Sequence, residues 1–303
     1  MLPDFFVIGA PKSGTTSLCD YLHQHPDVFI SSHKEPHHFS YEDDGWPRWA
    51  VRDRAEYEDL FAEARPGQVL GEGSTWTLYS EGAPKRIAAA VPDARFVALL
   101  RHPTDRAFSN WTSNRRRGSE DMDTFEAALE AEPARVARRG WAWHDHYVRA
   151  GFYADQLERY FDAFGRDRVL VLLFDDLKAD TPGVVRRVYE FIGVDGSFEP
   201  DTAKVHNKSY LPVSRRLHDF SRRSSRLKST LKRVLPGNLG ARLKGRVGAL
   251  NRTDPPTIAP ETQRRLDEMY RPHIERLSVL LGEDVTARWL DRSGPAGRGG
   301  TTG

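Results

Sequence analysis

A loop that could bind a phosphate group lies close to the start of the chain. Residues 9–16 read Gly-Ala-Pro-Lys-Ser-Gly-Thr-Thr and stand between an apolar run, residues 5–8, and a helical pattern, residues 15–25. Backbone N–H groups converge at such a strand-to-helix loop, and the helix N-terminus carries partial positive charge. The glycines let the backbone approach an anion, and the threonine hydroxyls can donate hydrogen bonds. The sequence therefore predicts an anion site here.

The lysine of this loop argues against one class of nucleotide-binding protein. In the P-loop of nucleoside-triphosphate enzymes, Lys and then Ser or Thr follow the second glycine. Here Thr15 follows Gly14, and the lysine is Lys12, inside the loop. The side chain that would reach a γ-phosphate is therefore missing from its place.

A second candidate anion site follows another apolar run, residues 96–100. Arg101 stands directly after this run, and Ser109 comes eight residues later in a helical pattern, residues 104–117. The guanidinium group offers a planar pair of donors that fits phosphate oxygens. An arginine at a strand end can equally form a surface ion pair, so this signal alone leaves both roles open.

A cluster of histidines invites a metal-site interpretation, which the sequence does not support. Residues 33–39 read His-Lys-Glu-Pro-His-His-Phe. A helical zinc motif needs Glu directly after the first His and an unbroken helix. Lys34 occupies that place and Pro36 breaks any helix. Residues 144–146 give no metal signal either, and the single cysteine, Cys19, excludes a disulfide or a cysteine-rich metal site. We therefore expect no metal.

The elements that must position these residues alternate between two patterns. Short apolar runs predict buried strands, and the amphipathic stretches between them predict helices. This alternation predicts an α/β fold, a P-loop-like parallel sheet flanked by helices. Strands are expected at residues 5–8, 69–70, 96–100 and 169–174, and helices at 15–25, 83–90, 104–117 (with Thr104 as its cap), 147–164, 181–192 and 261–281.

The chain is expected to form a single domain over residues 1–292, followed by a disordered tail, residues 293–303, rich in Gly, Ala and Thr. Residues 204–250 stand apart because they hold thirteen basic residues and one acidic residue. We predict a basic, mainly helical excursion here. It is either a solvated helical face or a mobile cover over an anionic ligand.

Length and composition are those of an ordinary globular protein. The chain has 303 residues, 39% hydrophobic and 29% charged, with a net charge of +2. No run approaches the roughly 20 apolar residues of a transmembrane helix. The run at residues 5–8 is too short for the core of a signal peptide. We therefore expect a cytoplasmic protein without a transmembrane segment, while its oligomeric state stays open.

Three motifs together resemble the sulfotransferases that use PAPS (3′-phosphoadenosine 5′-phosphosulfate), in particular the branch with the heparan sulfate enzymes and bacterial relatives. Residues 5–18 are similar to the family's 5′-phosphosulfate loop, and residues 100–109 to its 3′-phosphate motif. Residues 35–39 are similar to its Glu-x-His-Phe-Phe element. The resemblance extends over residues 4–290 and implies the sulfotransferase fold, PAPS as donor, PAP (the 3′,5′-bisphosphate) as product and no metal requirement.

The resemblance also implies roles for individual residues. Glu35 would take the proton of the acceptor hydroxyl, and Lys12 would stabilise charge on the leaving phosphate and the sulfonate. His37 would line the same site and is the rival base, as in the family's phenol and steroid enzymes. Arg101 and Ser109 would bind the 3′-phosphate. Donor contacts are expected from Pro11, Lys12, Ser13, Gly14, Thr15, Thr16, Ser17, Arg101, Ser109 and Arg252.

The sequence departs from the family's pattern in two places. Gly73 stands where the animal heparan enzymes have a lysine, which puts a glycosaminoglycan acceptor in doubt. The family's C-terminal Lys-Gly-Arg loop is degenerate: Arg252 is the nearby cation, and residues 244–246 match by letters but lie too far from the following helix. The acceptor therefore stays open as a small molecule or carbohydrate: a hydroxyl, or less readily an amine, of a sugar, glycolipid or natural product.

Two other function classes compete with this interpretation. A P-loop kinase or NTPase is favoured by the apolar run at residues 169–174, because it ends in Asp175 and Asp176 as a Walker B strand does. A nucleic-acid-binding module is favoured by the basic residues 204–250. That segment has only Tyr210 and Phe220 as aromatic residues, whereas base stacking needs more. We expect no nucleic-acid partner.

Overall fold

The computed structural model describes residues 1–41, 49–139, 143–203, 211–212, 252–253 and 257–291. Nearly all of the basic segment 204–250 and the whole tail 293–303 lie outside the described residues, so the predictions made for them stay predictions. Within the described ranges, no helix is long and apolar enough to cross a membrane.

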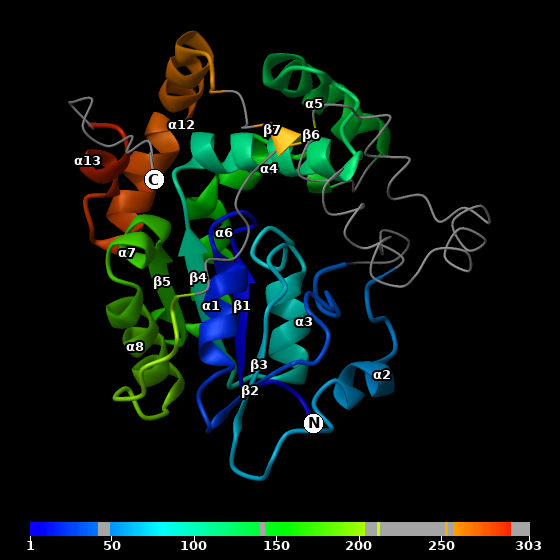
Figure 1. The fold of residues 1–303 in the computed structure, drawn as a ribbon, viewed down its shortest axis with the longest axis vertical. Helices are drawn as coiled ribbons and strands as arrows, with labels where there is room; N and C mark the ends of the chain where they lie inside the picture. The colour runs from blue at the N-terminus through cyan, green and yellow to red at the C-terminus, as the bar shows by residue number, and fades with distance from the viewer. Residues whose placement is uncertain (42–48, 140–142, 204–210, 213–251, 254–256, 292–303) are drawn as a thin grey trace, which may run out of the picture.

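A parallel sheet forms the centre of the molecule (Figure 1). Among the described residues it has five strands, in the order β2-β3-β1-β4-β5. Phe5 of the central strand lies opposite Gly71 on one side and Arg95 on the other. Because the strands are parallel, their carboxyl ends and the loops that follow lie along one edge. The strands are β1 (Phe5–Gly9), β2 (Val28–Ile30), β3 (Val69–Glu72), β4 (Arg95–Leu100) and β5 (Val169–Leu173).

Helices cover both faces of the sheet because the central strand is apolar on both sides. Successive side chains of a strand point to opposite faces. Phe5 accordingly packs into one core and Phe6 into the other. The first core is closed by α1 (Thr15–Leu22) and α8 (Thr181–Ile192), and the second by α3 (Ala83–Ala90), α6 (Tyr153–Phe164) and α12 (Pro260–Leu281).

The remaining elements lie around this three-layer body. Helix α4 (Pro103–Arg117) leaves the end of β4 and crosses the edge where the parallel strands end (Figure 1). The others are α2 (Arg54–Asp59), α5 (Phe125–Arg139), α7 (Phe174–Ala179), α13 (Val285–Trp289) and an antiparallel pair, β6 (Leu211–Pro212) with β7 (Arg252–Thr253).

The predicted α/β architecture is confirmed, although some elements, among them β2 and α5, were not predicted and others begin or end at different residues. The helix expected from residue 147 begins at Tyr153, because Arg149–Gly151 form a 3-10 turn and Phe152 has a non-helical backbone. Thr104 is not the cap of α4: His102 holds that position and Pro103 opens the helix. Proline is favoured there because its missing N–H has no partner in a first turn anyway.

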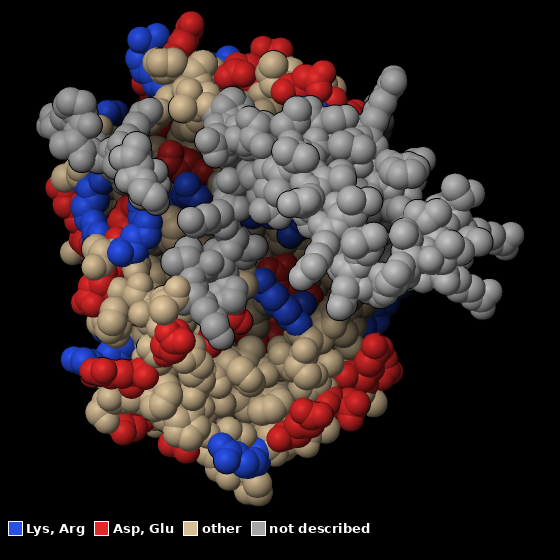
Figure 2. Space-filling view, in the orientation of Figure 1, with Lys and Arg blue, Asp and Glu red and all other residues tan. Residues whose placement is uncertain are grey.

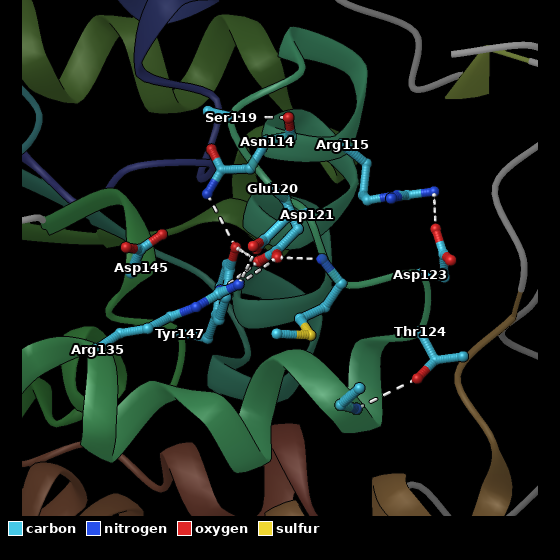
Figure 3. Close-up of polar contacts among 12 residues, drawn as sticks. Asn114, Arg115, Ser119, Glu120, Asp121, Asp123, Thr124, Arg135, Asp145 and Tyr147 are labelled. Atoms are coloured by element: carbon cyan, nitrogen blue, oxygen red, sulfur yellow. Dashed lines mark hydrogen bonds and ion pairs between the residues drawn. The ribbon is translucent and has the colours of Figure 1, made fainter. Parts of the chain in front are cut away.

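A buried ion pair holds the end of α4 against α5 (Figure 3). Arg135 donates two hydrogen bonds of 2.8 Å to the carboxylate of Glu120, and the Tyr147 hydroxyl donates a third of 2.5 Å. Asn114 of α4 donates to the Tyr147 hydroxyl at 3.0 Å. Burial opposes ionisation of Glu120, but these bonds outweigh it and lower its pKa to about 2. The cluster therefore fixes the last turn of α4.

Candidate active site

A cavity of about 540 Å³ lies at the edge where the parallel strands end. Near the centre of the face in Figure 2, a group of basic side chains in blue lies beside acidic side chains in red. The loop between β1 and α1, the end of β4, one side of α4 and the start of α7 all contribute to its lining. The lining brings Glu35 together with most of the predicted donor contacts: Pro11, Lys12, Gly14, Thr15, Thr16, Ser17, Arg101 and Ser109.

The loop between β1 and α1 has the geometry of an anion site. Lys12 and Gly14 have positive φ angles of 71° and 90°, which fold the loop over the start of α1. A Cβ atom at Gly14 would lie 2.8 Å from a ring carbon of Phe174, so a larger residue would collide there as well as strain the backbone. No acidic residue stands in the first turn of α1 to compete for its N-terminus.

Lys12 is held in a strongly positive environment. Burial, followed by the charges of Arg117 and Arg116, lowers the pKa of its ammonium group to about 8. Arg101 donates a hydrogen bond of 3.2 Å to the Lys12 carbonyl, which ties the loop to the end of β4. An anionic ligand placed here would relieve the repulsion among these cations.

Arg101 also joins the loop to α7. Its guanidinium carbon lies 5.2 Å from the centre of the Phe174 ring, and its carbonyl accepts a hydrogen bond of 2.8 Å from the Tyr153 hydroxyl. Ser109 lines the same cavity from the second turn of α4. Arg101 at the end of β4 and Ser109 on the following helix therefore line the same cavity, as the sequence predicted.

Glu35 is the carboxylate that faces the cavity. Its Oε1 accepts a hydrogen bond of 3.3 Å from the Thr75 hydroxyl, and its Oε2 lies 3.5 Å from Nε2 of His37. Burial raises its pKa, but the hydrogen bond and charge of His37, with the charges of Lys34 and Arg117, hold the pKa below its ordinary value. Glu35 is therefore ionised at neutral pH and able to accept a proton.

A second carboxyl group lies beneath this one and does not face the cavity. Glu72, at the end of β3, is 2% exposed, and its Oε2 accepts a hydrogen bond of 2.8 Å from the Tyr57 hydroxyl. Burial raises its pKa. Its position makes it part of the support of the site rather than a rival for the acceptor proton.

Two of the predicted site residues whose side chains the structure describes do not line the cavity. Ser13 is fully buried, and His37 is 1% exposed behind Glu35. The His37 ring reaches the site through Glu35, because its Nε2 lies 3.5 Å from the Glu35 carboxylate, and its role stays a prediction. The backbone of Arg252 lies in β7, and its side chain lies outside the described residues. Within the described ranges, no group of three or more His, Cys, Asp or Glu could hold a metal ion.

Several cations of the cavity were missed by sequence reasoning. Lys34 lies near the loop and donates a hydrogen bond to the Thr16 hydroxyl. Arg116 and Arg117 line the cavity from the last turn of α4, and Lys178 from α7. The signal for the arginines is present in the sequence: they follow Ser109 by seven and eight residues, the spacing of one helix face.

The two aspartates that favoured a kinase, Asp175 and Asp176, have a different role in the structure. The strand β5 ends at Leu173, so Asp175 and Asp176 lie in the first turn of α7. Asp176 forms an ion pair with Arg288 of α13, and Asp175 lies 3.0 Å from Lys178. Neither aspartate lines the cavity, so they do not form a Walker B site.

The comparison with known protein families settles the relationship of the chain. The model of the sulfotransferase family matches residues 3–200. The chain belongs to the sulfotransferase family. Mouse heparan sulfate glucosamine 3-O-sulfotransferase 3B1 is 27% identical over 284 residues, which are 93% of this chain and 64% of that protein. Human carbohydrate sulfotransferase 15 is 25% identical and is matched over 54% of its length. The chain thus spans less than two thirds of these relatives.

Solved sulfotransferases share the fold. The sulfotransferase from Alicyclobacillus acidocaldarius superimposes with a TM-score of 0.73 at 29% identity, over 95% of this chain and 98% of that one. Mouse sulfotransferase SULT7A1, solved with PAP, gives a TM-score of 0.50 at 16% identity, over 90% of this chain and 85% of its own. This second likeness concerns the fold alone.

Proposed function

We propose that this chain transfers a sulfuryl group from PAPS to a hydroxyl group of an acceptor. The observation that carries the proposal is that two anion sites and a carboxylate line one cavity: the loop with Lys12, the strand end with Arg101, and Glu35. PAPS carries anionic groups at both ends of its ribose, so it fits a cavity with two such sites. Membership of the sulfotransferase family supports the same reaction.

The donor would lie across the edge of the sheet. The loop and the N-terminus of α1 would hold the 5′-phosphosulfate, and Arg101 with Ser109 the 3′-phosphate. Phe174 and Leu177 also line the cavity and would offer apolar surface to the adenine ring. No metal is part of this proposal.

The reaction would be an in-line displacement at sulfur. The acceptor oxygen forms a bond to sulfur while the bond from sulfur to the 5′-phosphate oxygen breaks. Glu35 takes the proton of the acceptor hydroxyl, and Lys12 stabilises the negative charge that develops on the departing phosphate oxygen. The products are the sulfated acceptor and PAP.

The pH dependence of donor capture tests the role of Lys12. Its ammonium group is charged below its pKa of about 8 and neutral above it. We expect kcat/KM for PAPS to fall about tenfold per pH unit above that value, because this parameter reports the free enzyme. In Lys12→Arg the side chain stays charged, so whatever activity remains should lack this falling limb. The same limb in both proteins would exclude Lys12 as its source.

The acceptor is proposed to be an anionic saccharide. Six basic side chains line the cavity, Lys12, Lys34, Arg101, Arg116, Arg117 and Lys178, and within the described ranges Glu35 is the acidic residue among them. Lys178 is paired with Asp175, and PAPS brings about four negative charges, so an anionic acceptor would be attracted by the basic side chains that the donor does not contact. The names of the heparan sulfate and carbohydrate relatives support a saccharide.

Arg117 provides a test of this acceptor class. We expect Arg117→Ala to raise KM for an anionic oligosaccharide about tenfold, with a much smaller change in KM for PAPS. Arg115→Ala is the matched control, because Arg115 lies in the same helical turn but pairs with Asp123 at 3.0 Å outside the cavity lining. Equal effects of the two substitutions, or a preference for neutral acceptors, would contradict an anionic acceptor.

Ligand-induced thermal stabilisation tests the donor. A ligand that binds the folded state raises the melting temperature by an amount that grows with the logarithm of its concentration divided by its dissociation constant. We expect PAP to stabilise the protein and Mg-ATP at the same concentration not to do so. Stabilisation by Mg-ATP alone would favour the kinase alternative. The cytoplasmic location expected from the sequence belongs to this proposal and is tested by fractionation of the source cell.

A further inference from the structure

A chain of hydrogen-bonding groups runs from the interior of the protein to Glu35. The Thr77 hydroxyl lies 2.7 Å from the Ser40 hydroxyl, which lies 3.3 Å from Nδ1 of His37. Nε2 on the other side of the ring lies 3.5 Å from the Glu35 carboxylate. The three inner residues are buried and do not line the cavity, so they act on a substrate only through Glu35.

The backbone around this chain is held in place. Glu35 and His37 have positive φ angles of 57° and 55°, a backbone conformation that residues other than glycine seldom adopt. The His37 N–H donates to the Ser74 hydroxyl at 2.9 Å, and its carbonyl accepts from the Ser40 N–H at 3.1 Å. Strained backbone persists where its surroundings fix it, and it is concentrated at functional sites.

The contacts select one arrangement of protons in a neutral ring. An ionised carboxylate only accepts hydrogen bonds, so the ring nitrogen that faces Glu35 must carry the proton. Nδ1 is then bare and accepts a hydrogen bond from the Ser40 hydroxyl, which leaves the Ser40 oxygen to accept a hydrogen bond from the Thr77 hydroxyl. The opposite tautomer would place the lone pair of Nε2 against the carboxylate. Tyr41 and Trp143 pack edge-on against the ring, at 5.6 and 6.4 Å between centres, and limit its rotation.

We propose that Ser40, supported by Thr77, is a positioning residue that keeps the proton of His37 on Nε2 and thereby holds the Glu35 carboxylate toward the acceptor. The proposal rests on the proposed role of Glu35 as the base. Ser40 does not touch the donor or the acceptor. It acts through the tautomer of His37, because the partner of one ring nitrogen decides which nitrogen carries the proton.

The effect of a Ser40 substitution on kcat tests whether Ser40 positions Glu35 for catalysis. We expect Ser40→Ala to lower kcat about tenfold, with KM for PAPS and the affinity for PAP unchanged within about twofold. Thr77→Val, which keeps Ser40 but removes its support, should lower kcat less. Ser80→Ala is the matched control: Ser80 is equally buried, but its hydroxyl accepts from Arg86 and has no link to His37. Equal losses of kcat in Ser40→Ala and Ser80→Ala would overturn the proposal.

The tautomer itself can be measured without any substrate. Nitrogen NMR of isotope-labelled histidine side chains distinguishes a protonated from a bare ring nitrogen, and loss of one signal in His37→Gln assigns the resonance. In the neutral ring of the native protein we expect a protonated Nε2 and a bare Nδ1, and in Ser40→Ala a mixture of tautomers. A neutral native ring with its proton on Nδ1, or an unchanged spectrum in Ser40→Ala, would overturn the proposal. Absence of PAP binding would instead count against the proposed function.

Discussion

Glu35→Gln should lose turnover by about 10²–10⁴-fold while PAP binds as tightly as before. The amide has nearly the shape of the carboxylate but cannot accept a proton from the acceptor. Glu35 stands about one third exposed at the cavity, and its pKa below the ordinary value keeps it ionised. Single-turnover kinetics at saturating PAPS and acceptor, with PAP affinity measured by calorimetry, separate chemistry from binding.

The rival base needs its own variant. His37→Gln should retain more activity than Glu35→Gln, because His37 lies behind the carboxylate and outside the cavity lining. Glu72→Gln should also keep more turnover than Glu35→Gln, since Glu72 supports the site without facing the cavity. Near-normal turnover in Glu35→Gln together with inactive His37→Gln would transfer the role of base to the histidine.

The second large effect is expected at the other end of the donor. Arg101→Ala should weaken the binding of PAP by about 10²–10³-fold, because a guanidinium group partly removed from water makes strong charge-assisted hydrogen bonds to phosphate. Adenosine 5′-phosphosulfate, which lacks the 3′-phosphate, should lose far less affinity. The difference between the two ligands isolates the phosphate contact from the hydrogen bond that Arg101 donates to the Lys12 carbonyl.

Two further proteins complete this experiment. Ser109→Ala should also weaken the binding of PAP more than that of adenosine 5′-phosphosulfate. The loss for PAP should be about tenfold, because one neutral hydrogen bond is lost. Arg101→Lys keeps a charge but not the planar pair of donors. Its affinity for PAP should therefore lie between those of Arg101→Ala and the native protein. Equal losses for PAP and adenosine 5′-phosphosulfate in Arg101→Ala would mean that Arg101 supports the loop and does not bind the 3′-phosphate.

Much of the site could be predicted because its signals are local. The loop at residues 9–16 lies between a strand and a helix in the sequence itself, and Arg101 follows another strand directly. Parallel strands then place both loops at one edge, whatever the details of packing. The fold class followed from the same alternation, and helix α3 was predicted with its observed bounds.

What the sequence did not show depends on contacts between distant segments. Strand β2 was missed because three residues are too few for a pattern, and its pairing with β3 defines it. The burial of His37 depends on Tyr41 and Trp143, which the fold brings together from positions far apart in the chain. The end of α4 is fixed by the ion pair of Glu120 with Arg135, which no local pattern indicates.

The central claim is that the cavity transfers a sulfuryl group and not a phosphoryl group. The most direct measurement supplies the native protein with PAPS labelled at sulfur and Mg-ATP labelled at the γ-phosphate, in the presence of anionic oligosaccharides and extract of the source cell. We predict that the sulfur label appears on an organic acceptor in an amount equal to the PAP released, and that Glu35→Gln abolishes this transfer. Transfer of the phosphorus label instead, unaffected by competing PAP, would contradict the account.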